Sequence, residues 1–177
     1  YVKKQTLQAV RKGANVIQFP EAALSGYGPK HFPTLESYPW DALRDQLRIV
    51  CEMAASQGIW VVLGAMRRSE RESPTLCVHV ISDTGKIVGT YDKQRLYGRE
   101  KEMFTAGPGP LVIEIHGYRC GFLLCYDNCY PELYEAYRGM NVGLLFHSFY
   151  NAANSRKTDI RDLMLANLMV RAADNQM

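Results

Sequence analysis

Residues 121–132 read Gly121-Phe122-Leu123-Leu124-Cys125-Tyr126-Asp127-Asn128-Cys129-Tyr130-Pro131-Glu132. The apolar run before Cys125 predicts a buried strand, and the Pro-Glu pair that closes the stretch is typical of a helix start. A strand end would fix the thiol on a rigid element, and the free N–H groups of the next helical turn can lower a thiol pKa and receive a developing oxyanion. The stretch therefore makes Cys125 a candidate nucleophile, although most free cysteines are small buried hydrophobes.

A carboxylate occupies a similar place early in the chain. Residues 15–19 predict a short strand, which must end at Pro20 because proline has no N–H to donate, and Glu21 follows directly. The glycines and proline of residues 26–29 mark an irregular loop of the kind that carries functional residues. Taken alone, such a glutamate is more often a solvated surface charge.

A lysine ends a third β segment. Residues 86–91, which follow the turn Asp83-Thr84-Gly85, predict a strand that leads to Lys93. A lone lysine in that place is ordinarily a solvated charge or a guard of a sheet edge. Glutamate, lysine and cysteine thus appear in that order, each at the end of a β segment and each followed by loop or helix signals.

Several separated motifs resemble the nitrilase superfamily of carbon-nitrogen hydrolases, in particular its amidase- and carbamoylase-like branch. The motifs are Phe-Pro-Glu with a later Gly-Tyr, Tyr-Asp-Lys with a later Leu, Glu100 shortly before Phe-Thr-Ala-Gly, and Cys-Tyr-Asp with a later Tyr-Pro-Glu. Residues 171–175 look like the family's Arg-Ala-x-Glu-Asn helix. The resemblance extends from Gly13 to residue 175 and so covers most of the chain.

The resemblance implies a role for each matching residue. Cys125 is then the nucleophile, Glu21 the general base, and Lys93 the cation that stabilises the tetrahedral oxyanion. Glu100 matches a second glutamate that positions the substrate or the hydrolytic water. The backbone N–H of Tyr126 is the expected second oxyanion donor.

The resemblance also implies the reaction, which is hydrolysis of a non-peptide carbon-nitrogen bond through a thioester on the cysteine, with release of ammonia or an amine and no cofactor. True nitrilases usually carry tryptophan and glutamate after the cysteine, whereas Tyr126 and Asp127 stand there in this chain. We therefore expect a small-molecule amide or carbamoyl substrate rather than a nitrile. Tyr27, Tyr126 and His147 are the candidate residues around that substrate.

A zinc site is an alternative, because His116, Cys120, Cys125 and Cys129 are near one another in the sequence and zinc sites combine cysteine with histidine. Cys120 and Cys125 are an odd number of residues apart on what reads as one strand, so their side chains should face opposite sides. Neither a Cys-x-x-Cys pair nor a His-Glu-x-x-His helix occurs. We therefore predict no metal site.

Two further alternatives concern what the cysteine does. A cysteine protease could pair Cys125 with His116 or His147, but it would leave Glu21 and Lys93 unexplained. A catalytically silent hydrolase-like module could act as a scaffold, or the chain could be an inactive fragment. Retention of glutamate, lysine and cysteine together favours an enzyme, since a scaffold needs none of the three.

Composition places the chain in the ordinary globular class, with 177 residues, 47% hydrophobic residues and a formal charge of +3. The longest apolar stretch, residues 59–66, is far shorter than the ~20 residues that span a bilayer, so we expect no membrane partner. The charged segment 67–72 mixes bases with acids and indicates a solvated loop rather than a nucleic-acid surface. Five cysteines without a disulfide pattern favour reduced thiols and a cytoplasmic location.

Helix and strand signals alternate without a clear linker, so we predict one α/β domain over residues 1–177. The predicted helices are 2–11, 40–57, 131–138 and 159–175, and the predicted strands are 15–19, 59–66, 75–82, 86–91, 111–115, 118–124 and 142–146. The resemblance implies an α+β sandwich of four layers, α-β-β-α. It also implies a homodimer or higher homo-oligomer, because the family's helix after the cysteine packs against a second subunit. Compared with the family, the chain is short at both ends, so we expect a partial domain.

Overall fold

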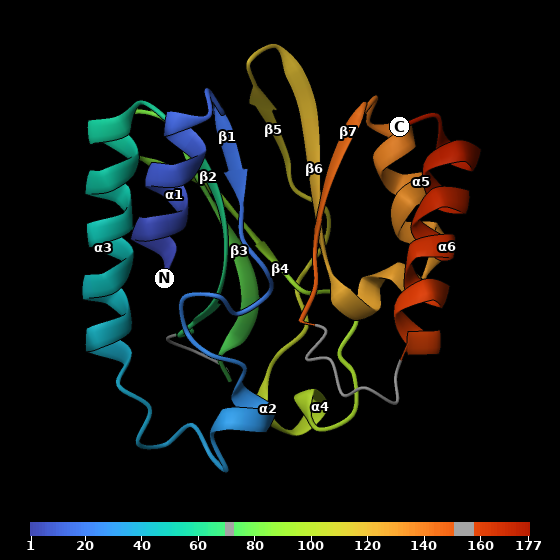
Figure 1. Ribbon diagram of the computed structural model, residues 1–177. Coiled ribbons are helices and arrows are strands. Elements are labelled where there is room, and N and C mark those ends of the chain that lie inside the picture. Colours follow the sequence, from blue (N-terminus) through green and yellow to red (C-terminus); the bar gives the residue numbers. More distant parts are fainter. Residues whose placement is uncertain (70–72, 151–157) are drawn as a thin grey trace.

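The protein is described by a computed structural model that covers residues 1–69, 73–150 and 158–177. Figure 1 shows four layers side by side: helices α1 and α3, a first sheet, a second sheet, and helices α5 and α6. This arrangement confirms the predicted α-β-β-α sandwich. Each sheet has one face toward the other sheet and one face toward a helical layer, which is how both faces of a mixed sheet become buried.

The first sheet has the strand order β1-β2-β3-β4. β1 (Val16–Gln18) pairs in parallel with β2 (Trp60–Arg67), and β2, β3 (Thr75–Ile81) and β4 (Ile87–Asp92) pair antiparallel. The predicted turn at residues 83–85 joins β3 to β4, and Gly85 has the positive φ of 77° that such a tight turn favours.

The second sheet has the order β5-β6-β7. β5 (Val112–Ile115) and β6 (Tyr118–Leu124) form the predicted hairpin through residues 116 and 117. β7 (Leu144–Ser148) pairs in parallel with β6, so the strands that carry Cys125 and His147 run side by side and end at the same edge. β7 begins two residues later than predicted, because residues 142 and 143 lead into the strand without joining its ladder.

The helices match their predicted spans closely. α1 (Val2–Arg11) and α3 (Trp40–Gln57) cover the first sheet, and α3 ends at Gly58, which caps it in the left-handed conformation. α5 (Pro131–Gly139) and α6 (Thr158–Asn175) cover the second sheet. The helical turn expected after Cys125 is a 3-10 helix, Cys125–Cys129, whereas two short helices were not predicted: α2 (Gly28–His31) and α4 (Glu100–Met103). They are too short to show a helical period in the sequence.

Two apolar cores follow from the layers. The larger lies between the sheets, where β3 contacts β6, and it includes Val78, Val80 and Phe122, all fully buried. The smaller lies between the first sheet and its helices and includes Val61 and Leu63. Alternate residues of β2 therefore serve different cores, as the period of a strand requires.

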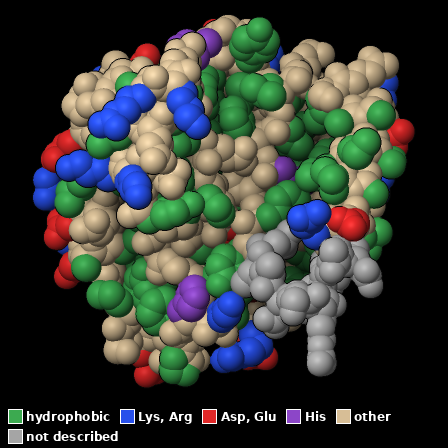
Figure 2. Space-filling view, in the orientation of Figure 1, with side chains coloured by type: hydrophobic (Ala, Val, Ile, Leu, Met, Phe, Trp, Pro, Cys, Tyr) green, Lys and Arg blue, Asp and Glu red, His purple; other side chains and the backbone are tan. Residues whose placement is uncertain are grey.

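The outer surface carries mixed charge. On the face shown in Figure 2, acidic side chains lie among the basic ones along the α3 side instead of leaving one large basic patch. Of the predicted charged loop, residues 70–72 lie outside the described residues. Within the described residues, none of the helices is both long and apolar enough to cross a membrane.

Candidate active site

Three of the predicted residues meet in the buried space at the strand ends. Lys93 directly follows β4 and its Nζ donates hydrogen bonds of 2.8 Å to Glu21 Oε1 and to Glu100 Oε1. The side chains of these three residues are at most 1% exposed. An ammonium group has three N–H donors, so this geometry leaves one for a further acceptor.

Glu100 is held in place from three sides. Its Oε1 accepts hydrogen bonds from Lys93 and, at 2.5 Å, from the Tyr27 hydroxyl, and its Oε2 accepts the backbone N–H of Tyr97 at 2.8 Å. Burial and the hydrogen bond to Glu100 raise the pKa of Tyr27 well above its ordinary value, so its hydroxyl keeps its proton. Tyr27 therefore contacts the predicted site through Glu100.

Cys125 lies at the sharp turn between β6 and the 3-10 helix. Its φ of 42° places it in the left-handed region, which a residue with a side chain adopts only at a cost. The following carboxylate stabilises this turn, because Asp127 Oδ2 accepts the backbone N–H of Leu124 at 2.9 Å and the Tyr91 hydroxyl at 2.7 Å, while Oδ1 accepts the N–H of Arg95 at 2.9 Å. The turn aims a partly exposed thiol out of a rigid strand end.

The thiol faces the Glu21 carboxylate. Glu21 Oε2 forms no hydrogen bond of ordinary length among the described residues, and the nearby Cys125 thiol acts as a donor that lowers the Glu21 pKa. Gln18, at the end of β1, and Ser148, at the end of β7, join the two sheets beside this point through a hydrogen bond of 2.9 Å. Glu21 and Cys125, more than a hundred residues apart in the sequence, are thereby brought together.

The protonation states follow from burial and from these neighbours. Burial raises the pKa of Glu21 above its ordinary 4.5, and the charge of Lys93 offsets only part of that rise. Burial alone would lower the pKa of Lys93, but the negative groups around it, Glu21 first, raise it, so Lys93 stays cationic. Burial and then the charge of Glu21 raise the pKa of Cys125 to about 12. The thiol is therefore protonated at neutral pH, contrary to the expectation that the helical turn lowers its pKa.

His147 lies behind Cys125. Its Nε2 is 3.3 Å from the carbonyl oxygen of Cys125, and its Nδ1 is 2.9 Å from the Tyr134 hydroxyl. Because a carbonyl can only accept, Nε2 carries the proton in that hydrogen bond. Burial lowers the pKa of His147 to about 3, so the ring is neutral. Both ring nitrogens are directed away from the thiol, which argues against the cysteine-protease alternative.

The remaining predicted residues lie at the surface of the site. The side chain of Tyr126 packs against the rings of Tyr97 and Tyr130, with centroids 5.0 and 5.5 Å away, while its backbone N–H lies in the first turn of the 3-10 helix. N–H groups in a first turn lack an acceptor within the helix. Tyr27 stacks on Tyr150 at 4.6 Å between ring centroids.

The grouping required for zinc does not form. His116 lies in the β5–β6 turn against the ring of Trp60, and Cys120 is buried in β6. Within the described residues, no group of three or more histidine, cysteine, aspartate or glutamate side chains is arranged to hold a metal ion.

Asp127 and Ser148 are supporting residues that the sequence analysis did not identify. Asp127 is fully buried two residues after the nucleophile candidate. A carboxylate so close to a buried strand could have indicated a hydrogen-bonded structural role, because charged side chains are rarely buried without partners. Ser148 donates to the Phe19 carbonyl at 2.9 Å, a contact 129 residues apart in the chain. No local pattern indicates a contact of that kind.

Comparison with known proteins identifies relatives of this chain and solved structures with a similar fold. The chain is 26% identical over 156 residues to the deaminated glutathione amidase of Yersinia enterocolitica, covering 80% of this chain and 54% of that protein. It is 30% identical over 140 residues to an arylacetonitrilase of Aspergillus niger, covering 71% and 41%. The chain thus spans about half the length of the curated relatives it matches.

The solved structures include an amidase from Nesterenkonia sp. AN1, in a mutant that shows the Michael addition of acrylamide at its active site cysteine. It superposes with a TM-score of 0.82 at 25% sequence identity, covering 99% of this chain and 67% of that one. The family model for carbon-nitrogen hydrolase matches residues 2–177. Because this match extends over almost the whole chain and the layers agree with an amidase of known structure, the chain belongs to the carbon-nitrogen hydrolase family.

Proposed function

We propose that the protein hydrolyses a small amide or N-carbamoyl compound, with Cys125 as nucleophile, Glu21 as general base and Lys93 as oxyanion donor. The single observation that carries this proposal is the buried contact of Lys93 Nζ with two carboxylates, at 2.8 Å each, beside a thiol that faces one of them. Such a cluster costs free energy to bury, so it is expected where chemistry needs it. Amidases among the relatives support the same reaction class.

In the first step, the unpaired Glu21 Oε2 takes the proton of Cys125 as Sγ attacks the amide carbon. The carbonyl oxygen becomes negative and is stabilised by the third N–H of Lys93 and the backbone N–H of Tyr126. Glu21 then returns the proton to the nitrogen as the carbon-nitrogen bond breaks. Ammonia or an amine leaves, and the acyl group remains on sulfur as a thioester.

In the second step, water attacks the thioester carbon and Glu21 takes its proton. The carbon-sulfur bond breaks, the acid is released, and the proton passes to the sulfur. Glu100, fixed by Tyr27 and the N–H of Tyr97, keeps Lys93 in line for the second oxyanion. Side chains, backbone N–H groups and water supply every group in this cycle, so the proposed cycle uses no cofactor.

An amide substrate is favoured over a nitrile by the residues after the nucleophile. Tyr126 and Asp127 stand where nitrilases usually carry tryptophan and glutamate. Both carboxylate oxygens of Asp127 already accept hydrogen bonds that stabilise the turn. Amidases named among the relatives act on amides, while one relative is an arylacetonitrilase, so nitriles belong in any substrate panel.

The proposal also covers the cellular compartment, the domain organisation and the assembly of the protein. None of the five cysteines is paired, which fits reduced thiols in a cytoplasm. We also propose that residues 1–177 act as one domain and assemble as a homodimer or higher homo-oligomer. Helix α6 exposes apolar side chains, Leu163 and Met169 among them, which supports the proposal that a second subunit covers this face of the helix.

A substrate panel with mass detection tests the chemistry. Simple amides, N-carbamoyl compounds and nitriles are incubated with the protein, released ammonia is measured, and intact mass with peptide mapping locates any acyl adduct. We expect an adduct on Cys125 with an amide or carbamoyl compound, loss of turnover in Cys125→Ala, and a fall in kcat of about 10²–10³-fold in Lys93→Ala.

The pH dependence of kcat/KM tests whether Glu21 is the general base. Because Glu21 must be ionised and burial raises its pKa above 4.5, log kcat/KM should fall on the acid side at a pH above that of an ordinary glutamate. The Glu21→Gln variant should lose both the rate and this acid limb. Turnover that survives Cys125→Ala would refute the mechanism, and a folded protein without any adduct would favour the silent-module alternative.

A further inference from the structure

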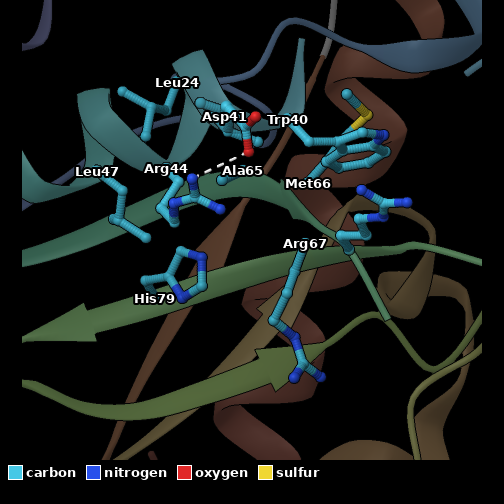
Figure 3. Close-up of a pocket in the computed structure, with 11 residues that line it drawn as sticks. Leu24, Trp40, Asp41, Arg44, Leu47, Ala65, Met66, Arg67 and His79 are labelled. Atoms are coloured by element: carbon cyan, nitrogen blue, oxygen red, sulfur yellow. Dashed lines mark ion pairs between the residues drawn. The ribbon is translucent and has the colours of Figure 1, made fainter. Parts of the chain in front are cut away.

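A cavity of about 280 Å³ lies between α3 and the strands β2 and β3. Figure 3 shows it, and no residue of the proposed triad lines it. Its volume is close to the lower end, about 300 Å³, of pockets that hold small organic ligands. The cavity is thus large enough for a compact molecule and separate from the proposed chemistry.

The walls of this cavity are mostly apolar. Leu43 and Leu47 come from α3, Leu24 comes from the loop after β1, and Ala65 lies on β2. The indole of Trp40 forms a flat, half-buried wall at the start of α3. Apolar and aromatic surfaces of this kind bind the hydrocarbon part of a ligand.

His79 closes the base of the cavity without adding charge. It is 5% exposed, and its ring nitrogens lie 3.0 Å from Thr90 Oγ1 and 3.5 Å from Cys77 Sγ. Burial lowers the pKa of His79 to about 4, so the ring is neutral. With both nitrogens already partnered, His79 is not a strong polar contact for a ligand.

The rim is basic. Arg44, Arg67 and Arg68 line it, and the only acid among the lining residues is Asp41. Arg44 pairs with Asp41 at 3.0 Å, and Arg67 pairs with Asp92 outside the cavity. Arg68 has no ion pair in the part of the chain that the structure describes, so the described residues leave one positive charge of the rim without an acidic partner. A guanidinium presents paired N–H donors that match a carboxylate.

We propose that this cavity binds a small carboxylate with a compact apolar tail, with the tail against Trp40 and the leucines and the carboxylate at the arginine rim. The Arg44–Asp41 pair is largely exposed on both sides, so it can exchange its partner at little cost. Binding here does not depend on turnover at Cys125, and the proposal stands or falls separately from the proposed reaction.

Tryptophan fluorescence provides the test. The chain has two tryptophans, and Trp60→Phe leaves Trp40 in the cavity wall as the only emitter. The protein is first treated with iodoacetamide, so that a carboxylate cannot enter the site at Cys125, and is then titrated with hexanoate. Hexan-1-ol, with the same tail and no charge, is the ligand control. Arg48→Gln, one turn further along α3 with its own partner Glu52, is the protein control.

We expect saturable quenching by hexanoate at millimolar concentration, weakened by salt and weaker with hexanol. Arg68→Gln and Arg44→Gln should each raise the Kd about tenfold, and Arg48→Gln should leave it unchanged. The proposal is overturned by quenching that does not saturate, by equal binding of the alcohol, or by equal loss in all three arginine variants. Since these arginines are exposed, the variants should fold normally.

Discussion

At the scale of single residues, Cys125 is held in an unfavourable backbone conformation by its neighbours. Its left-handed φ of 42° costs a non-glycine residue about 1 kcal/mol. Asp127 fixes the turn from one side through the Leu124 N–H, and His147 donates to the Cys125 carbonyl from the other. In the proposed reaction His147 is therefore a positioning residue, whose effect on the chemistry would pass through the backbone of the proposed nucleophile.

Substitution of His147 tests this role. His147→Leu removes the donor and should lower kcat about 10–100-fold with little change in KM, because a misplaced nucleophile slows the step without changing the pocket. His147→Gln keeps an N–H near the same place and should recover most of the rate. The measurements are kcat and KM, with thermal melts as the folding control. Equal losses in the two variants would contradict the positioning role.

At the scale of elements, β2 lies directly beneath the turn that carries Glu21. Gly64, in the middle of β2, has no space for a side chain, since a Cβ there would lie 2.2 Å from the Pro20 carbonyl oxygen and 2.8 Å from Glu21 Cα. Both neighbours are backbone atoms, which cannot rotate away. The close contact of strand and turn thus fixes the height of Glu21 above the sheet, and with it the 2.8 Å bond to Lys93.

The Gly64→Ala variant should therefore lose activity and stability together. We expect a loss of about 1–3 kcal/mol in the free energy of unfolding, as for other overpacked sites, and a marked fall in kcat because the Glu21 turn is displaced. Denaturant titration and steady-state kinetics measure the two effects. Gly139→Ala, at the end of α5 where a Cβ meets no atom within 4 Å, is the matched control and should be neutral or slightly stabilising. A fully active Gly64→Ala would show that the turn does not rest on β2.

At the scale of the whole molecule, each of the two sheets carries one histidine whose pKa is lowered by burial, His79 on β3 and His147 on β7. His79 is on β3, facing α3, and its pKa is lowered to about 4 by burial, from an ordinary 6.5. The unfolded chain therefore binds a proton at pH values where the folded chain does not. The contribution of neutral His79 to the free energy of unfolding is fully present above pH 6.5 and is lost as the pH falls toward 4. Burial lowers the pKa of His147, on β7, to about 3, so this ring acts in the same direction and contributes a loss of similar size.

Acid should thus destabilise the protein as the pH falls below the ordinary histidine pKa of 6.5. From pH 7 to pH 5 we expect His79 alone to remove about 2 kcal/mol from the free energy of unfolding. His79→Asn should reduce this decline, while His116→Asn, in the exposed β5–β6 turn, should leave it unchanged. Urea titrations at the two pH values measure the difference. A decline of the same size in His79→Asn would exclude this histidine as its source.

Much of the fold could be predicted from local pattern. The span of α3, with Gly58 after it, and the strand before Cys125 follow from periodicity and from residues that stop an element. The short helices α2 and α4 could not be predicted, because a few residues do not establish a period. Their shape is imposed by contacts such as that of Glu100 with the Tyr97 N–H.

The sequence by itself determined the order of the elements, the four layers through its family resemblance, and the candidates Glu21, Lys93 and Cys125. Only the tertiary structure decided how they meet: that Lys93 bridges two carboxylates, that Tyr27 acts through Glu100, and that His147 contacts a carbonyl instead of the thiol. It also decided that the thiol is protonated. The physical reason is that periodicity and propensity act over a few residues, whereas hydrogen bonds and desolvation depend on neighbours that the packing of two sheets brings from distant parts of the chain.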